Sequence, residues 1–424
     1  MADDSKLGSK IKQQISRFAG QLATGLNKTG RRFVAEMLYG IQAAKDVKVS
    51  NVARSLNESI LLIKTENRLC RNLAGADLTR HINRYLCWAG AGAVRKDTVL
   101  AVDLGDVRKE YARKMEYLAR VRDGSTGELC AGYTLCEVLA AHPDEDRIVP
   151  LYGELYSSAA DDFQSENVRL LAAMETVALA TGGRGIFAVD RGGDRRKILT
   201  PLLDNDWRFV IRQDGDRHVY LRSGIKCSVE RAAQWCRTDI EREVEVEREL
   251  CRETKRLRLG AMEVRLPERM PRRLWLVVIR GFGKKPIMLL SNVAPREGER
   301  EYAVRIAEVY LTRWKCEEAY RFLKQSYRLE DVRVRQYVSL RNTYALLHAV
   351  MYFVSAVLGA RVKLRLIFKK VCAKAKRFYE VAAFFQYAVA DGIYRLLFGS
   401  RSGAKAAPPQ DTAQSLLAFA QPPD

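Results

Sequence analysis

Residues 98–103, which read TVLAVD, form a run of apolar side chains that ends on an aspartate. Residues 185–190 repeat this pattern as GIFAVD, and residues 208–212 form a third such run, RFVIR. Short apolar runs bounded by polar residues are typical of buried strands. Between the first two runs, residues 166–180 space their apolar side chains as an amphipathic helix does. Strands that alternate with a helix in this order predict an α/β layer structure.

Further elements extend outward from these strands. Residues 128–140 and 147–156 have the composition of two more strands, and residues 195–203 predict a short helix. From 213 to 292 the apolar period changes to two, which predicts a β-rich insertion. Residues 300–329 contain neither glycine nor proline and predict one long helix.

The charge of the chain is concentrated at its two ends. The 424 residues carry a formal net charge of +21 and allow two or three domains. Residues 1–96 hold 17 basic and 7 acidic side chains, and residues 318–424 hold the same numbers, so each end has a net charge of +10. The centre, with 38 basic and 37 acidic side chains, is close to neutral. This distribution predicts a protein that binds a polyanion with its ends.

Composition also restricts the environment of the protein. The nine cysteines form no CxxC pair, which predicts reduced, structural thiols inside the cell. The first residues lack the apolar segment of a signal peptide. Residues 342–360 are uncharged and could just span a bilayer, but they contain an asparagine, a threonine, a histidine and a serine. We therefore favour a buried core helix there and keep a membrane span as the alternative.

The N-terminal region predicts a set of basic helices over residues 8–90. Ser50, Ala53 and Leu56 have the spacing found in the first helix of a helix-turn-helix motif. An ordinary helical bundle explains the same spacing equally well, and only the net positive charge favours contact with DNA.

Two carboxylates are placed at strand ends by this interpretation. Asp103 and Asp190 each close a buried run, and side chains at the carboxyl ends of strands face the crevice where α/β sheets bind ligands. An aspartate after a strand is also a common turn or cap residue, so each is weak evidence alone. Asp106 and Asp194 are nearby rivals, and Asp194 is placed where a helix cap is needed.

The predicted helix over residues 300–329 carries a narrow polar stripe. Tyr310, Arg313, Glu317 and Lys324 project to about 0°, −60°, −20° and −40° at ~100° per residue. Glu317 adds a third carboxylate, and the other three offer hydrogen-bond donors that suit phosphate oxygens. A solvated helix face with an Arg313–Glu317 pair remains the alternative.

The spacing Tyr-x2-Arg-x3-Glu-x6-Lys at residues 310–324 resembles the signature of the insertion-sequence-four (IS4) family of DDE transposases. FAVDRGGD around Asp190 resembles the second-aspartate block of that family, and LAVD around Asp103 resembles the first. The resemblance covers about residues 95–330. It implies an α/β, ribonuclease-H-like core, a mixed five-stranded sheet with helices, that carries the β-rich insertion and is flanked by helical N- and C-terminal domains.

The resemblance also implies the site and its partners. Asp103, Asp190 and Glu317 would be catalytic and would bind two Mg²⁺ or Mn²⁺ ions, while Tyr310, Arg313, Lys324 and Arg212 would contact DNA. The substrates would be the terminal inverted repeats of an insertion sequence and target double-stranded DNA. The protein would form a homodimer on DNA. It would be cytoplasmic and associated with the nucleoid, and it would not bind a membrane.

These inferences divide the chain into six segments. The expected boundaries are 1–95 for a basic helical DNA-binding domain, 96–212 for the first part of the catalytic core, 213–292 for the β-rich insertion, 293–330 for the helix that completes the core, 331–399 for a helical C-terminal region of dimerisation or DNA contact, and 400–424 for a disordered tail.

One feature departs from the family pattern. Some relatives carry a tryptophan, on the strand before the signature helix, that stacks on an extruded base; here that strand has Met288 at about this position. We expect Trp314, inside the signature helix, to pack in the core. Two further alternatives stay open: an inactive DNA-binding derivative of such an enzyme, and a ribonuclease-H-like nuclease without strand transfer.

Overall fold

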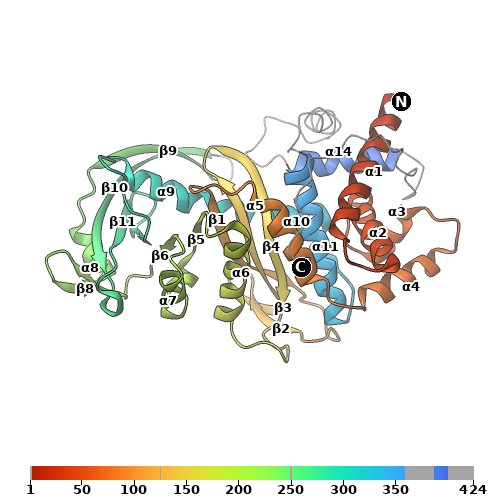
Figure 1. Cartoon of the computed structure of the whole chain (residues 1–424), viewed down its shortest axis with the longest axis horizontal. Coiled ribbons are helices and arrows are strands. Elements are labelled where there is room, and N and C mark those ends of the chain that lie inside the picture. The colour runs from red at the N-terminus through yellow and green to blue at the C-terminus, as the bar shows by residue number, and fades with distance from the viewer. Residues whose placement is uncertain (1, 125, 249–250, 359–385, 400–424) are drawn as a thin grey trace.

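The computed structural model describes residues 2–124, 126–248, 251–358 and 386–399. Helices from both ends of the chain gather at one end of an elongated molecule, and strands occupy the other (Figure 1). The expected disordered tail at 400–424 lies outside the described residues. So do residues 359–385 of the C-terminal region expected at 331–399.

Five strands form the central part of the sheet, in the order β4-β3-β1-β5-β6. β1 pairs antiparallel with β3, and β3 pairs antiparallel with β4, whereas β1, β5 and β6 are parallel. Their bounds are β1 Val99–Arg108, β3 Leu129–His142, β4 Glu145–Tyr156, β5 Ile186–Val189 and β6 Phe209–Arg212. Every strand predicted for this region is present. However, β1 does not end at Asp103 as we expected, because its antiparallel pairing with β3 continues to Arg108.

The β-rich insertion continues the same sheet. β12 pairs antiparallel with β6, and the order then runs through β11, β10, β7 and β8, while β9 pairs with β10. The bounds are β7 His218–Leu221, β8 Lys226–Ser228, β9 Ile240–Arg248, β10 Cys251–Arg265, β11 Leu274–Arg280 and β12 Ile287–Ser291. A helix that was not predicted, α8 (Val229–Trp235), packs beside β7 and β8. A short unpredicted strand, β2 (Ala119–Arg122), pairs with the start of β3.

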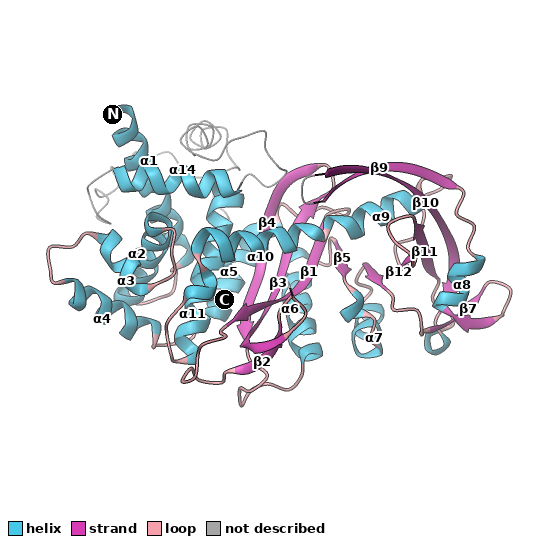
Figure 2. Cartoon of the chain, turned by 180° about the vertical axis from the view of Figure 1, so that it is seen from behind, coloured by secondary structure: helices cyan, strands magenta, loops and turns pink. Residues whose placement is uncertain are grey.

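Helices cover both faces of the sheet. α6 (Glu166–Thr181) and α7 (Arg196–Asp204) lie on one face, and α9 (Tyr302–Thr312) and α10 (Trp314–Tyr327) lie across the other, as the two opposite views show (Figures 1 and 2). The single helix predicted over residues 300–329 is described as two, α9 and α10. Arg313 lies between them and keeps helical backbone angles.

The N-terminal helices are present as predicted. Their bounds are α1 Ala2–Leu22, α2 Lys28–Ala44, α3 Val49–Leu56, α4 Leu62–Leu73 and α5 Thr79–Ala91. Ala53 and Leu56 of α3 are buried, and α3 packs on α2 and α4. The apolar residues of these helices join those of the sheet in one continuous core. The N-terminal region is therefore packed against the rest of the chain.

α11 (Tyr337–Tyr352) is a core helix, and α14 (Gln386–Gly399) packs on α1 and α2. Asn342, Thr343 and His348 are buried inside the protein. Within the described part of the chain, no helix is both long enough and apolar enough to cross a membrane.

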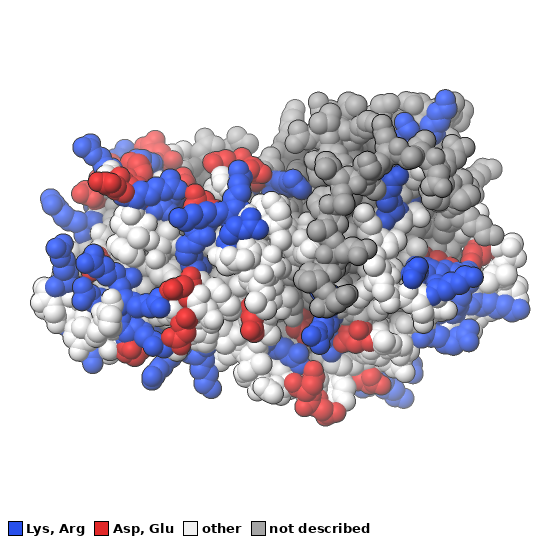
Figure 3. Space-filling model, viewed as in Figure 1, with Lys and Arg blue, Asp and Glu red and all other residues white. Residues whose placement is uncertain are grey.

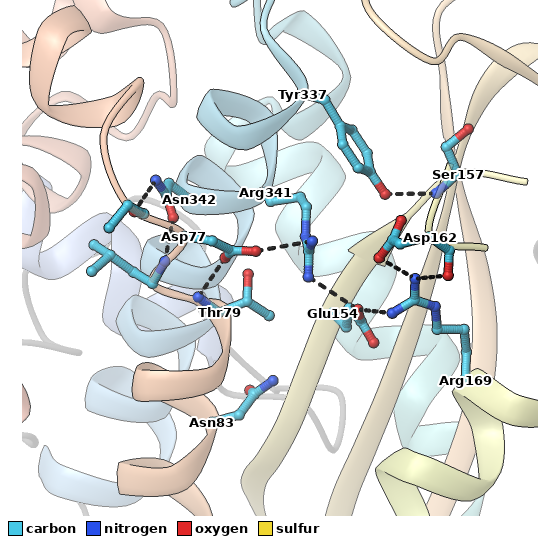
Figure 4. Close-up of polar contacts among 12 residues, drawn as sticks. Asp77, Thr79, Asn83, Glu154, Ser157, Asp162, Arg169, Tyr337, Arg341 and Asn342 are labelled. Atoms are coloured by element: carbon cyan, nitrogen blue, oxygen red, sulfur yellow. Dashed lines mark hydrogen bonds and ion pairs between the residues drawn. The ribbon is translucent and has the colours of Figure 1, made fainter. Parts of the chain in front are cut away.

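A buried polar network joins α11 to the N-terminal helices and to the sheet edge (Figure 4). The carboxylate of Glu154 on β4 lies 3.2 Å from both Arg169 on α6 and Arg341 on α11. Arg341 also pairs with Asp77, before α5, at 2.9 Å. Asn83 of α5 exchanges two 3.0 Å hydrogen bonds with the backbone of Gly153, as a neighbouring strand would. These bonds satisfy polar groups that burial would otherwise leave unpaired.

Candidate active site

The two strand-associated aspartates lie beside each other. The parallel pairing of β1 and β5 ends at Val102 and Val189, and Asp103 and Asp190 are the next residues of the two strands. The pairing of β5 and β6 ends at Val189 and Ile211, so Arg212 follows at the same level on the third strand. The structure therefore aligns three predicted site residues at one end of the parallel ladder.

Asp190 also caps a turn, as the alternative interpretation of this residue predicts. It precedes the 3₁₀ turn Arg191–Gly193, and its Oδ1 accepts a hydrogen bond from the Gly192 amide at 2.8 Å. Its second carboxylate oxygen leaves a negative charge at this exposed position. The cap fixes the side chain without neutralising it.

α10 is held against β1 at the level of Asp103. The ring of Tyr320 packs on Gly105, where a Cβ would lie 2.9 Å from the ring, so only glycine allows this approach. The Tyr320 hydroxyl donates to the Asp103 carbonyl oxygen at 2.9 Å, and the Cys316 thiol donates to the Ala101 carbonyl oxygen at 3.3 Å. These contacts place Glu317 beside the strand-end aspartates.

Arg313 connects two of the three carboxylates. Its Nη1 lies 3.0 Å from Oδ1 of Asp103, and its Nη2 lies 2.8 Å from Oε1 of Glu317. The guanidinium is 5.9 Å from the ring of Tyr310, and its side chain is only 11% exposed. Among the described residues its Nε has no hydrogen-bond partner. Arg313 thus bonds to carboxylates rather than facing solvent, where it could meet DNA.

The electrostatics show that Asp190 and Glu317 act on Asp103. Burial, opposed by Arg313 and assisted by the charges of Asp190 and Glu317, raises the pKa of Asp103 to about 7. For Arg313 itself, burial favours the neutral form, but Asp103, Tyr310 and Glu317 together outweigh burial and raise the pKa above its ordinary value. The site therefore holds more negative charge than one guanidinium can neutralise.

The donor set suits a hard divalent cation, because carboxylate oxygens are the ligands that Mg²⁺ and Mn²⁺ prefer. The present spacing is not that of a formed site: in the described part of the chain, no three acidic, histidine or cysteine side chains are arranged to hold an ion. Arg313 accounts for this, since it occupies oxygens of Asp103 and Glu317 that an ion would need.

Lys324, the last residue of the stripe, lies in a separate ionic cluster. Its Nζ is 3.0 Å from Asp106 and 3.1 Å from Glu330. Asp106, which was an alternative candidate to Asp103 in the sequence, is thereby paired with a cation. The neighbouring Lys109 is buried, and its Nζ donates to the carbonyl oxygens of Glu330 and Val332. Glu330 and Lys109 carried no recognisable pattern in the sequence.

Three other sequence expectations have clear outcomes. Asp194 does not cap α7, whose cap position is Arg195; instead it pairs with Arg217 at 2.6 Å. Met288 is buried on β12. Trp314 is 58% exposed, so the expectation that it packs in the core is wrong. It lies one turn before Glu317 on the same side of α10, where its ring faces solvent.

Residues 164–353 match a family model described as "Transposase DDE domain". The match supports a transposase of the DDE type. It spans less than half of the chain and includes Asp190, Arg313, Glu317 and Lys324 but not Asp103. No curated protein matches the chain. Among solved structures, the chain is similar to a piggyBac transposase in a synaptic complex with hairpin DNA, at 10% identity and a TM-score of 0.44, covering 94% of this chain and 80% of that one.

Proposed function

We propose that the protein is a metal-dependent DNA transposase of the IS4 type, which cuts the ends of an element and joins them to target DNA. The observation that carries the proposal is that Asp103 and Asp190 follow paired residues of adjacent parallel strands, while Arg313 joins Asp103 to Glu317. The order β4-β3-β1-β5-β6, with two antiparallel pairs followed by two parallel pairs, supports a ribonuclease-H-like core. The match to a DDE domain supports the same reaction class.

In this proposal the three carboxylates hold two Mg²⁺ or Mn²⁺ ions, which would activate an oxygen nucleophile and stabilise the leaving oxygen of a phosphodiester. Asp103 and Asp190 are held by the strands and the 3₁₀ turn, so their positions change little. Glu317 is carried by α10, and its side chain is 38% exposed, so it can adjust.

Arg313 has two roles in this scheme. Without ions it pairs with both Asp103 and Glu317. To contact an end phosphate, as the resemblance implies, its guanidinium must leave these carboxylates. Tyr310 beside it, Arg212 on β6 and Lys324 remain proposed DNA contacts, and Lys324 would likewise have to exchange the partners Asp106 and Glu330.

The proposed substrates are terminal inverted repeats and target duplex, bound by a homodimer in the cytoplasm at the nucleoid. The N-terminal helices, with their net charge of +10, are the proposed recognition region. An inactive derivative would bind DNA without cutting it. A nuclease without strand transfer would cut but fail to join pre-cut ends to a plasmid.

The test is the substitution Glu317→Gln, which removes one negative charge at nearly constant volume. We expect it to reduce Mg²⁺-dependent cleavage of a duplex carrying the element end by at least about 10³-fold, while DNA affinity stays the same. Glu318→Gln is the matched control, because Glu318 is the next residue of α10 and pairs with Arg321 instead. Cleavage retained in Glu317→Gln, or lost equally in both variants, would reject the assignment.

A further inference from the structure

A cavity of about 460 Å³ lies between the start of α3 and the segment that joins α10 to α11. It has no place in the proposed active site. Its lining is mixed: valines and a cysteine contribute apolar surface, and the charged side chains are Lys48, Glu66, Arg333 and Arg335. The walls therefore come from two parts of the chain that are almost 300 residues apart, the N-terminal helices and the region that follows the catalytic helix.

The cavity has an excess of positive charge. Lys48 pairs with Asp331 at 2.6 Å, but Arg333 and Arg335 are exposed and have no ion-pair partner among the described residues. Glu66 is the one acidic side chain among the lining residues, so the three basic side chains outnumber it.

The chain connects this cavity to the proposed active site. Lys324 reaches Glu330, and Lys109 at the end of β1 holds the carbonyl oxygen of Val332, directly before Arg333. Along β1, the six residues from Asp103 to Lys109 span ~20 Å at ~3.3 Å per residue. Duplex DNA rises ~3.4 Å per base pair, so this distance corresponds to about six base pairs.

We propose that this cavity binds the sugar-phosphate backbone of duplex DNA whose end lies in the proposed active site. The proposal rests on the proposed function and adds a second contact region to it. Two guanidinium groups and an ammonium group offer charged donors to phosphate oxygens, and the Ser50 hydroxyl offers a neutral one. None of these groups selects a base, so the contact is independent of DNA sequence.

The openness of the site favours a polymer over a small anion. Arg333 and Arg335 are exposed, so they can follow a backbone across the surface rather than enclose a single ion. Further exposed basic residues, Arg54, Lys64 and Arg71, belong to α3 and α4. Figure 3 shows basic side chains at this end of the molecule and others at the opposite end, over the strands. The cavity thus lies beside a larger basic surface.

The test uses the full chain and a 30-base-pair duplex in a titration at several salt concentrations. Arg333→Gln and Arg335→Gln, singly and combined, remove charge from exposed side chains and should leave the melting temperature unchanged. Each removes one phosphate contact, so the slope of log affinity against log salt should fall by about 0.9 per substitution, for specific and unrelated duplexes alike.

Arg222→Gln is the matched control, because Arg222 is also exposed but lies between β7 and β8 at the opposite end of the molecule (Figure 1). It should leave the slope unchanged. The inference is overturned if the double variant keeps the wild-type slope, or if Arg222→Gln lowers it equally. It is also overturned if inorganic phosphate raises the melting temperature of the wild type but not of the variants, while the variants bind DNA as the wild type does. That result would indicate a site for a small anion. Metal-dependent cleavage by the wild type tests the proposed function separately.

Discussion

Arg313 is the residue whose partners in the structure differ most from those predicted from the sequence. Its spacing predicts a phosphate contact, yet its guanidinium lies between Asp103 and Glu317. Both observations suit a residue that changes partners. A buried carboxylate needs a compensating charge, and Arg313 is the cation within reach of Asp103.

Replacing Arg313 tests directly whether its guanidinium and a metal ion compete for the carboxylates of Asp103 and Glu317. In Arg313→Gln we expect the metal-free protein to lose about 1–3 kcal/mol of stability, because Asp103 and Glu317 lose their counter-ion. Mn²⁺ should then raise the melting temperature more than it does in the wild type, since no guanidinium competes for the oxygens. Thermal unfolding in EDTA and in Mn²⁺ measures both effects.

Arg321→Gln provides the control, because Arg321 lies on the same helix and pairs only with Glu318 among the described residues. It should respond to Mn²⁺ as the wild type does. An equal or smaller Mn²⁺ response in Arg313→Gln than in the wild type would contradict the exchange.

Lys109 should make stability depend on alkaline pH. Burial lowers its pKa from 10.5 to about 8 in the folded protein. Between pH 8 and 10.5 the unfolded chain keeps a proton that the folded protein has lost, so the stability contributed by this residue rises with pH, by up to about 1.4 kcal/mol per unit. Below pH 8 the contribution is constant.

Lys109→Met removes this titration while retaining the length of the side chain. We expect the stability of the wild type relative to Lys109→Met to rise between pH 8 and 10.5, as measured by urea unfolding at several pH values. A difference that stays flat or falls across this range would show that Lys109 does not titrate there.

At the scale of elements, β4 is the strand through which the N-terminal helices contact the sheet. Glu154 joins it to α6 and α11, and Gly153 joins it to α5.

The buried carboxylate of Glu154 should stabilise the fold by holding two arginines. Glu154→Gln leaves Arg169 and Arg341 without this charge, and we expect a loss of about 2–4 kcal/mol in urea unfolding. Glu145→Gln, on the same strand, removes an exposed pair with Arg95 and should cost less than about 1 kcal/mol. Equal losses in the two variants would show that burial of Glu154 is unimportant.

At the scale of the whole molecule, one apolar core extends from α1 through the sheet to α11. The expected domain boundary between residues 95 and 96 therefore does not divide the apolar core into two separate cores. Because the helices at 2–91 and the sheet bury apolar surface against each other, neither part keeps its full core alone.

We therefore expect the chain to unfold in one cooperative transition. Calorimetry should give a single peak, and circular dichroism at 222 nm should coincide with tryptophan fluorescence along a urea titration. Two resolved transitions, with the helices lost before the sheet, would show that the N-terminal region is an independent domain.

Local sequence was sufficient to identify most elements of this protein and the residue types of its site. The apolar runs before Asp103 and Asp190 became β1 and β5, and the long amphipathic segments became helices, because strand and helix periodicities depend on neighbouring residues. The polar stripe of residues 310–324 likewise predicted Glu317 as the third carboxylate, and its catalytic role stays a prediction.

Only the tertiary structure decided which groups meet. That Arg313 pairs with Asp103, that Lys324 pairs with Asp106, that Trp314 is exposed, and that the insertion continues the central sheet through β12 and β6 all depend on contacts between distant segments. Such contacts depend on how strands pair and helices pack, and a side chain takes the partner that this packing brings within a few ångströms, so no local pattern could have specified them.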